Sequence, residues 1–227
     1  MNTSALVCFV LAAISTSIGT PIRYEYEFHY AEPSSTSLLI NGIFDQVAAT
    51  HNELLKQFIE NSNVGLRQMR SSIVKAASAA DTPPDKPLQF VEQLSDAIEQ
   101  IGALRDDETR VLEDKTKSAL SEARQEALRS KSIKNLKSNF ESLAALWGDE
   151  AVGQVFTDFN AGLEGLKKTL AQMMADSGMG TASEGLKTAI DGIVAGRVKA
   201  EAAGRLMLAK QSNEILENAV VNLQKAF

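Results

Sequence analysis

Two histidines, His29 and His51, are the side chains of this chain best suited to hold a metal ion or to transfer a proton. They lie far apart in the sequence, and neither has the glutamate three positions before it that di-metal sites of helix bundles use. The chain also has no Gly-x-Ser-x-Gly motif and no Gly-Lys-Ser/Thr phosphate loop. We therefore expect no catalytic residue, no metal site and no cofactor, in a protein that is not an enzyme.

His51 falls on a stripe of apolar residues that recurs with helical spacing. A histidine at such a position is more often a core residue with hydrogen-bonded ring nitrogens than a ligand or a switch. We therefore interpret His51 as structural, with the ligand and switch roles as alternatives.

Aromatic residues concentrate just before the first predicted helix. The segment Arg23–Tyr30 alternates aromatic and polar residues with a period of two, and it holds all three tyrosines of the chain. This alternation predicts an extended arm over residues 20–36, although no second strand is predicted to pair with it. The alternative is a short propeptide. We expect the arm to contact a partner through four aromatic residues: Tyr24, Tyr26, Phe28 and Tyr30.

The first 19 residues have the pattern of a secretory signal peptide. Ala5–Ile14 is a short apolar run, and Ser17, Ile18 and Gly19 form a small-x-small cleavage site. The only cysteine, Cys8, lies inside this segment. We therefore expect a secreted, extracellular protein without cysteine after cleavage and without a transmembrane segment.

Apolar residues recur every three or four positions from Leu38 to Phe227, which predicts an all-α fold and a single domain over residues 37–227. Clear breaks are the loop Asp81–Pro87, with three of the five prolines, and the segment Asp176–Thr181. With one more turn near residue 131, the result is an elongated antiparallel bundle of four long helices. Extra breaks at about 62 and 148 would give five to six helices, since Asn61–Asn63, Gly65 and Gly148 disfavour continuous helix.

The apolar stripe varies in quality along the chain. It thins in Arg105–Lys117, directly after Leu104, and again in Gly196–Gly204, just before Leu206. Glycine is concentrated after Trp147, which indicates either close helix packing or a loosened second half. The best-filled stripe predicts a face for lipid or another hydrophobic ligand, made of Trp147, Phe156, Phe159, Leu163, Leu166, Leu170 and Met173.

The charges do not point to a polyanionic partner. The net charge is −6, from 23 basic and 29 acidic residues that are interspersed along the chain. No basic stripe is present that could neutralise phosphates. We expect no nucleic acid and no purely electrostatic binding to anionic membranes.

One helical segment, Lys115–Leu128 (KTKSALSEARQEAL), resembles helices of the apolipophorin III-like exchangeable apolipoproteins in its pattern of apolar and charged residues. The resemblance rests on helix patterning over residues 37–227 and on no diagnostic motif. It implies a secreted, cysteine-free helix bundle that opens on lipid surfaces. Members of that class have five shorter helices, so a bundle of four long helices would depart from it.

Two functions are compatible with these features. The first is a non-enzymatic helical bundle that acts by binding an unknown protein partner, as a structural or interaction module in an extracellular fluid or matrix. Its coiled-coil-like spacing is also compatible with self-association. The alternative is an amphipathic-helix carrier of lipid or of another hydrophobic ligand, which opens on lipid surfaces.

Overall fold

The computed structural model describes residues 36–80, 84–130, 133–178 and 184–226. These ranges contain helices and no strand, so the all-α prediction is confirmed. The predicted signal peptide and residues 20–35 of the predicted arm lie outside them. The described helices are α2 (Thr36–Ser78), α3 (Pro87–Ser130), α4 (Ile133–Leu146), α5 (Asp149–Val155), α6 (Thr157–Asp176) and α7 (Glu184–Ala226).

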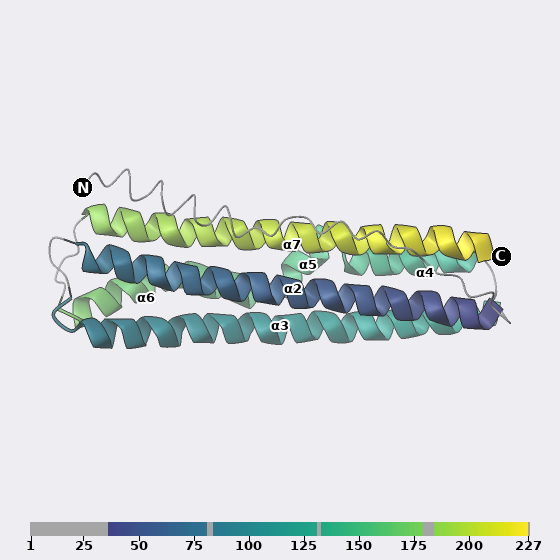
Figure 1. Cartoon of the computed structure of the whole chain (residues 1–227), viewed down its shortest axis with the longest axis horizontal. Helices are drawn as coiled ribbons and strands as arrows, with labels where there is room; N and C mark the ends of the chain where they lie inside the picture. Colours follow the sequence, from purple (N-terminus) through teal and green to yellow (C-terminus); the bar gives the residue numbers. More distant parts are fainter. Residues whose placement is uncertain (1–35, 81–83, 131–132, 179–183, 227) are drawn as a thin grey trace. The chain divides into compact units, whose positions relative to one another are not determined.

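The described ranges hold six helices, so the expectation of four long helices is wrong, and the count agrees with the alternative of five to six. The predicted break at 148 is confirmed, because α4 ends at Leu146 and α5 begins at Asp149. The predicted break near 62 is wrong, because α2 continues without interruption through that region (Figure 1). Residues 131–132, at the third predicted turn, lie outside the described ranges.

Contacts between Cα atoms divide the chain into two compact units. Within the described ranges, unit 1 comprises residues 59–108 and 156–204, and unit 2 comprises residues 36–58, 109–155 and 205–226. Each unit therefore contains part of α2, α3 and α7. Helix α6 belongs to unit 1, and α4 and α5 belong to unit 2.

In unit 1, two sets of backbone contacts show that α3 and α6 run in opposite directions. At one end, the Glu108 carboxylate on α3 accepts hydrogen bonds from the backbone N–H groups of Asp158 (2.7 Å) and Phe159 (3.1 Å) at the start of α6. At the other end, the Ser177 carbonyl after α6 accepts from the N–H groups of Asp85 (2.9 Å) and Lys86 (3.2 Å) before α3. Both ends of α6 are thus tied to α3.

The first of these contacts predicts that Glu108→Ala lowers the free energy of unfolding by about 1–2 kcal/mol, the usual cost of losing a helix cap. The first N–H groups of a helix lack intrahelical acceptors, and a carboxylate also interacts favourably with the positive end of the helix dipole. Urea unfolding of the wild type and the variant measures the loss. Glu99→Ala, at an exposed position of the same helix, is the control and should change stability by less than about 0.5 kcal/mol. Equal effects of the two substitutions would contradict the capping role.

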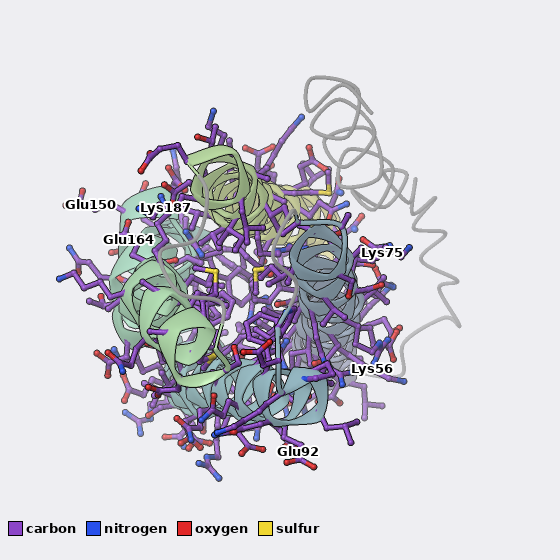
Figure 2. All side chains as sticks on the ribbon, turned by 90° about the vertical axis from the view of Figure 1, so that its left-hand side faces the viewer. Lys56, Lys75, Glu92, Glu150, Glu164 and Lys187 are labelled. Atoms are coloured by element: carbon purple, nitrogen blue, oxygen red, sulfur yellow. The ribbon has the colours of Figure 1, made fainter. Side chains whose placement is uncertain are left out.

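The interior of unit 1 is mainly apolar, and α6 contributes one inward face. Charged side chains on the outer surfaces of its helices point away from that interior, as Figure 2 shows for Lys75, Glu92, Glu164 and Lys187. Gly162 of α6 lies close to α3, where an added Cβ would be 3.3 Å from side-chain atoms of Ile101 and Leu104. The inward residues of α6 are Phe159, Leu163, Leu166, Leu170, Met173 and Met174.

In unit 2, ring contacts set the direction of α4 relative to α2. Phe44 stacks on Phe140 with centroids 5.5 Å apart, and His51 stacks on Trp147 with centroids 4.1 Å apart. Because the residue numbers rise together on the two segments, α2 and α4 run in the same direction. Arg124 of α3 forms an ion pair with Asp45 and lies 5.9 Å from the Phe44 ring centroid, which adds a cation–π contact at the edge of this core.

Candidate functional site

Unit 1 contains a cluster of polar side chains, which we call the charged layer: Ser62, Asn63, Arg105, Asp106, Arg197 and Glu201. Four of the six are buried, whereas Asn63 is half-buried and Asp106 is exposed. The Glu201 carboxylate of α7 is its centre. It accepts a hydrogen bond from the Ser62 hydroxyl of α2 at 2.7 Å and pairs with the Arg197 guanidinium at 2.7 Å. Glu201 is 1% exposed, so this ion pair is removed from water.

Gly65 makes room for this ion pair. A Cβ atom placed on Gly65 would lie 1.3 Å from Nη1 and 2.3 Å from Cζ of Arg197. The guanidinium therefore occupies the volume that any larger residue at position 65 would need. Ser62 and Gly65 are two of the residues that made α2 appear breakable in the sequence, and both serve the charged layer.

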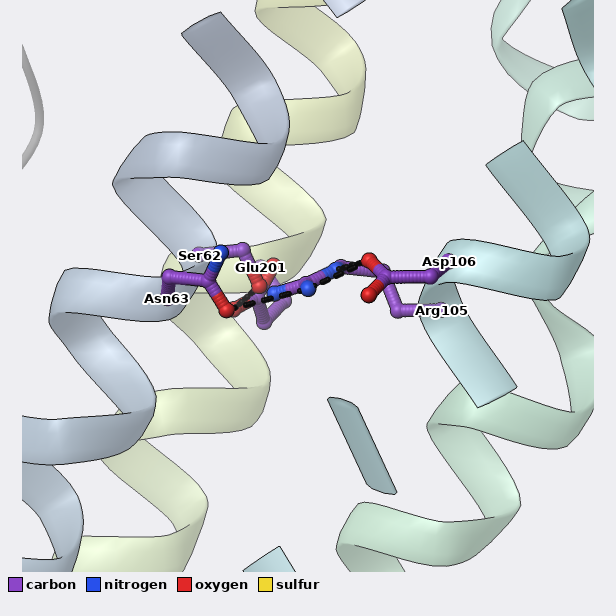
Figure 3. A network of polar contacts seen from close by, with 5 residues as sticks. All are labelled: Ser62, Asn63, Arg105, Asp106 and Glu201. Atoms are coloured by element: carbon purple, nitrogen blue, oxygen red, sulfur yellow. Dashed lines mark hydrogen bonds and ion pairs between the residues drawn. The ribbon is translucent and has the colours of Figure 1, made fainter. Parts of the chain in front are cut away.

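Arg105 brings a second buried guanidinium to the charged layer from α3. Its Nη2 donates to the Asn63 side-chain oxygen of α2 at 3.0 Å, and its Nε donates to Asp106 at 3.0 Å. Figure 3 shows Arg105 extending between Asp106 and Asn63, with Ser62 beside Glu201. The charged layer thus connects α2 to both α3 and α7 by hydrogen bonds.

The electrostatic balance of the charged layer depends on Glu201. Burial lowers the pKa of the Arg197 guanidinium, the charge of Glu201 and its hydrogen bond raise it, and the positive charge of Arg105 lowers it. Glu201 is the only buried carboxylate among the residues that the structure describes. Its removal would leave the Arg197 charge in the interior without its counter-ion.

Unit 2 contains a different buried cluster, the histidine layer, made of His51, Thr116, Trp147 and Ser212. His51 Nδ1 lies 3.1 Å from the Ser212 hydroxyl of α7, and Nε2 lies 3.4 Å from the Thr116 hydroxyl of α3. Trp147 Nε1 donates to the same Thr116 hydroxyl at 2.9 Å, while its ring stacks on the imidazole. The preferred interpretation of His51, a buried residue with hydrogen-bonded ring nitrogens, is confirmed.

Burial lowers the pKa of His51 from 6.5 to about 3. The imidazole is therefore neutral at physiological pH, with one nitrogen that donates and one that accepts a hydrogen bond. The neutral imidazole is enclosed by the two hydroxyl groups and by the Trp147 indole. The histidine layer is therefore a buried, hydrogen-bonded part of the core of unit 2.

The structure places the residues of the predicted hydrophobic face in the interiors of the two units. Trp147, Phe156, Phe159, Leu163, Leu166, Leu170 and Met173 are all buried. They are core residues of the described helices, and their role as a face for lipid or another hydrophobic ligand stays a prediction. The four aromatic residues of the predicted arm, Tyr24, Tyr26, Phe28 and Tyr30, lie outside the described ranges, so the partner-binding arm stays a prediction.

Sequence reasoning did not identify Arg105, Arg197 or Glu201 as interior residues. A signal was present, because the buried positions Arg197, Glu201 and Arg205 of α7 are spaced four apart and continue the apolar positions Ile190 and Ile193. Charge at these positions masked the helical period, so the segment looked like a poor stripe.

Other types of site find little support in the described part of the chain. No group of three or more metal-ligating side chains occurs there. Within the same ranges, no helix combines the length and the apolar character that crossing a membrane requires. In comparisons with known proteins, no family model, no curated protein and no solved structure matches the chain.

Proposed function

We propose that the chain is a secreted, non-enzymatic helical bundle that acts by binding, as a structural or interaction module in an extracellular fluid or matrix. The observation that supports this proposal is the pair of polar layers in the two cores. Each layer joins helices of its unit through specific hydrogen bonds, so the inner faces of these helices are committed to packing against each other. The outer surfaces remain for a protein partner or a second copy of the chain.

The polar layers also oppose the use of the inner faces on lipid. If the helices of unit 1 opened onto a lipid surface, Arg105, Arg197 and Glu201 would have to leave their present partners and face the acyl chains. An unpaired charge in an apolar medium is strongly unfavourable, whereas exposed charges elsewhere on these helices stay in water. A helix that opens on lipid is better served by an uninterrupted apolar face.

The outer surface supports a partner contact that is mostly polar. Large apolar side chains are exposed singly, and Leu88 of α3 is the most exposed of those described, at 78%. Near it on the same helix lie the exposed carboxylates of Glu92, Asp96 and Glu99. Surfaces of this kind suit a specific protein contact more than insertion into a bilayer.

The lipid carrier is the second candidate, and the apolar face of α6 favours it. Its inward residues from Phe159 to Met174 form a stripe without a polar interruption. Release of α6 from unit 1 would therefore present a continuous hydrophobic face.

Flotation with phosphatidylcholine vesicles at neutral pH distinguishes the two candidates. We expect the protein to stay in the bottom fraction of the gradient, where it also runs without vesicles, because its inner faces are held by the polar layers. The emission of Trp147, the only tryptophan, should keep its wavelength, and the thermal melt should be the same with and without lipid. Flotation together with a shift of the Trp147 emission would overturn the interaction-module proposal in favour of the lipid carrier.

A further inference from the structure

The histidine layer contains no charged partner for its titratable residue, whereas the charged layer contains an ion pair. His51 is 1% exposed and packs between Trp147, Thr116 and Ser212, so its ring is fully enclosed. Its hydrogen-bond partners are hydroxyl groups, which carry no charge. The layer therefore accommodates a neutral imidazole and offers no counter-ion to an imidazolium.

The charged groups around His51 also fail to compensate a positive charge. Arg205 of α7 is the only charged residue, among those described in unit 2, that is buried, and it has the same sign as an imidazolium. The carboxylates within three positions of the four histidine-layer residues lie at exposed or half-exposed positions: Glu53 on α2, Glu113 and Asp114 on α3, Asp149 and Glu150 on α5, and Glu214 on α7. An unpaired charge in the core is strongly destabilising.

We propose that the histidine layer makes unit 2 acid-sensitive, because the binding of one proton by His51 shifts the equilibrium of unit 2 toward an open state. Opening hydrates the imidazolium and breaks its stacking contact with Trp147. It also exposes the apolar core around Phe44 and Phe140. This proposal stands independently of the proposed function, because it concerns the stability of unit 2 and not its partner.

The sign of the pH dependence follows from where the proton binds. The pKa of His51 is about 3 in the folded chain and about 6.5 when the histidine is in water. Between these values the unfolded chain binds a proton that the folded chain does not bind. Stability is therefore fully present above pH 6.5 and is lost as the pH falls toward 3. The unfolding equilibrium constant should increase by about 30-fold between pH 7.5 and 5.0 because of this one residue.

Urea unfolding at pH 7.5 and 5.0, followed by Trp147 emission, tests the proposal, because most carboxylates stay ionised in this range. The wild type should show the 30-fold increase, and His51→Gln, which does not titrate, should lose it. His29→Gln, which removes the other histidine, is the matched control and should keep it. If His51→Gln does not fold, His51→Phe keeps a ring beside Trp147 and serves the same purpose.

An NMR titration of the His51 ring in the folded wild type adds a measurement that needs no variant. We expect the ring to remain neutral at pH 5.0. Two results would overturn the proposal: a midpoint near 6.5 in the folded protein, or an equal pH effect in the wild type and the non-titrating variant.

Discussion

Replacing Glu201 by glutamine should lower the free energy of unfolding by about 3–5 kcal/mol, the cost of removing one partner from a buried ion pair. Glutamine keeps the size of the side chain and can still accept a hydrogen bond from Ser62, but it cannot compensate the charge of Arg197. The guanidinium, 5% exposed, would then be a buried cation without its counter-ion. Chemical unfolding at pH 7 measures the loss.

A surface ion pair on the same helix gives the control for Glu201→Gln. Asp191 of α7 lies 3.9 Å from Lys167 of α6, and both side chains are substantially exposed. Asp191→Asn removes the same charge in the same unit and should cost no more than about 1 kcal/mol. Adding Arg197→Met to Glu201→Gln should restore most of the lost stability, because no uncompensated charge then remains. A cost for Glu201→Gln as small as that for Asp191→Asn would show that the buried pair has no special role.

Replacing Gly65 by alanine should destabilise the protein by about 1–3 kcal/mol, the cost of adding a methyl group to a filled core. The added Cβ would occupy the position of Arg197 Nη1, so the guanidinium must move away from Glu201 or α2 must shift. This result is opposite to the one that helix propensity predicts, since alanine is favoured over glycine in a helix interior by about 1 kcal/mol. Chemical unfolding of the wild type and of Gly65→Ala shows whether the free energy of unfolding falls or rises.

Gly42 provides the matched control within the same helix. A Cβ atom at Gly42 would meet nothing within 4 Å, so Gly42→Ala should stabilise α2 by up to about 1 kcal/mol. The same chemical change should thus have opposite signs at positions 42 and 65. A stabilising effect at both positions would contradict the close packing of Gly65 against Arg197.

The helical period could be predicted from the sequence because most inward positions are apolar. Ile40, Phe44 and Val47 of α2, for example, follow the spacing of three or four positions, and they are buried. The break at 148 could also be predicted, because glycine at the end of one helix is followed by aspartate at the start of the next. These features depend on local sequence and on the spacing of apolar residues.

The interior arginines were not predicted, because a hydropathy pattern assigns charged side chains to the surface even where their spacing continues the inner face. At two places the hydropathy pattern assigned a leucine to the interior where the adjacent arginine is the buried residue. Leu104 and Leu206 were placed on the apolar stripe, but they are 37% and 55% exposed, while the adjacent Arg105 and Arg205 are buried. A buried arginine is stable only with partners from other helices, and those partners are remote in sequence. Asn63, for example, is 42 positions from Arg105.

The uninterrupted helix at residues 61–65 has the same explanation. Asn, Ser and Gly are weak helix formers, so local sequence favours a break there. Their contacts with Arg105, Glu201 and Arg197 exist only in the folded unit and stabilise the helical conformation. The residues that resemble helix breakers are thus the residues that α2 contributes to the charged layer and to the space for Arg197.

The central claim is that the charged layer fixes the packing of the helices in unit 1. In this layer, the absence of a side chain at Gly65 leaves the space that the Arg197 guanidinium occupies beside Glu201. The most direct test is to measure the effect of Gly65→Ala on the free energy of unfolding in two backgrounds, the wild type and Arg197→Met/Glu201→Gln. We predict that alanine destabilises the wild type and stabilises the second background, where the guanidinium is absent and helix propensity decides. If Gly65→Ala changed the free energy of unfolding by the same amount and in the same direction in both backgrounds, the claim would be contradicted.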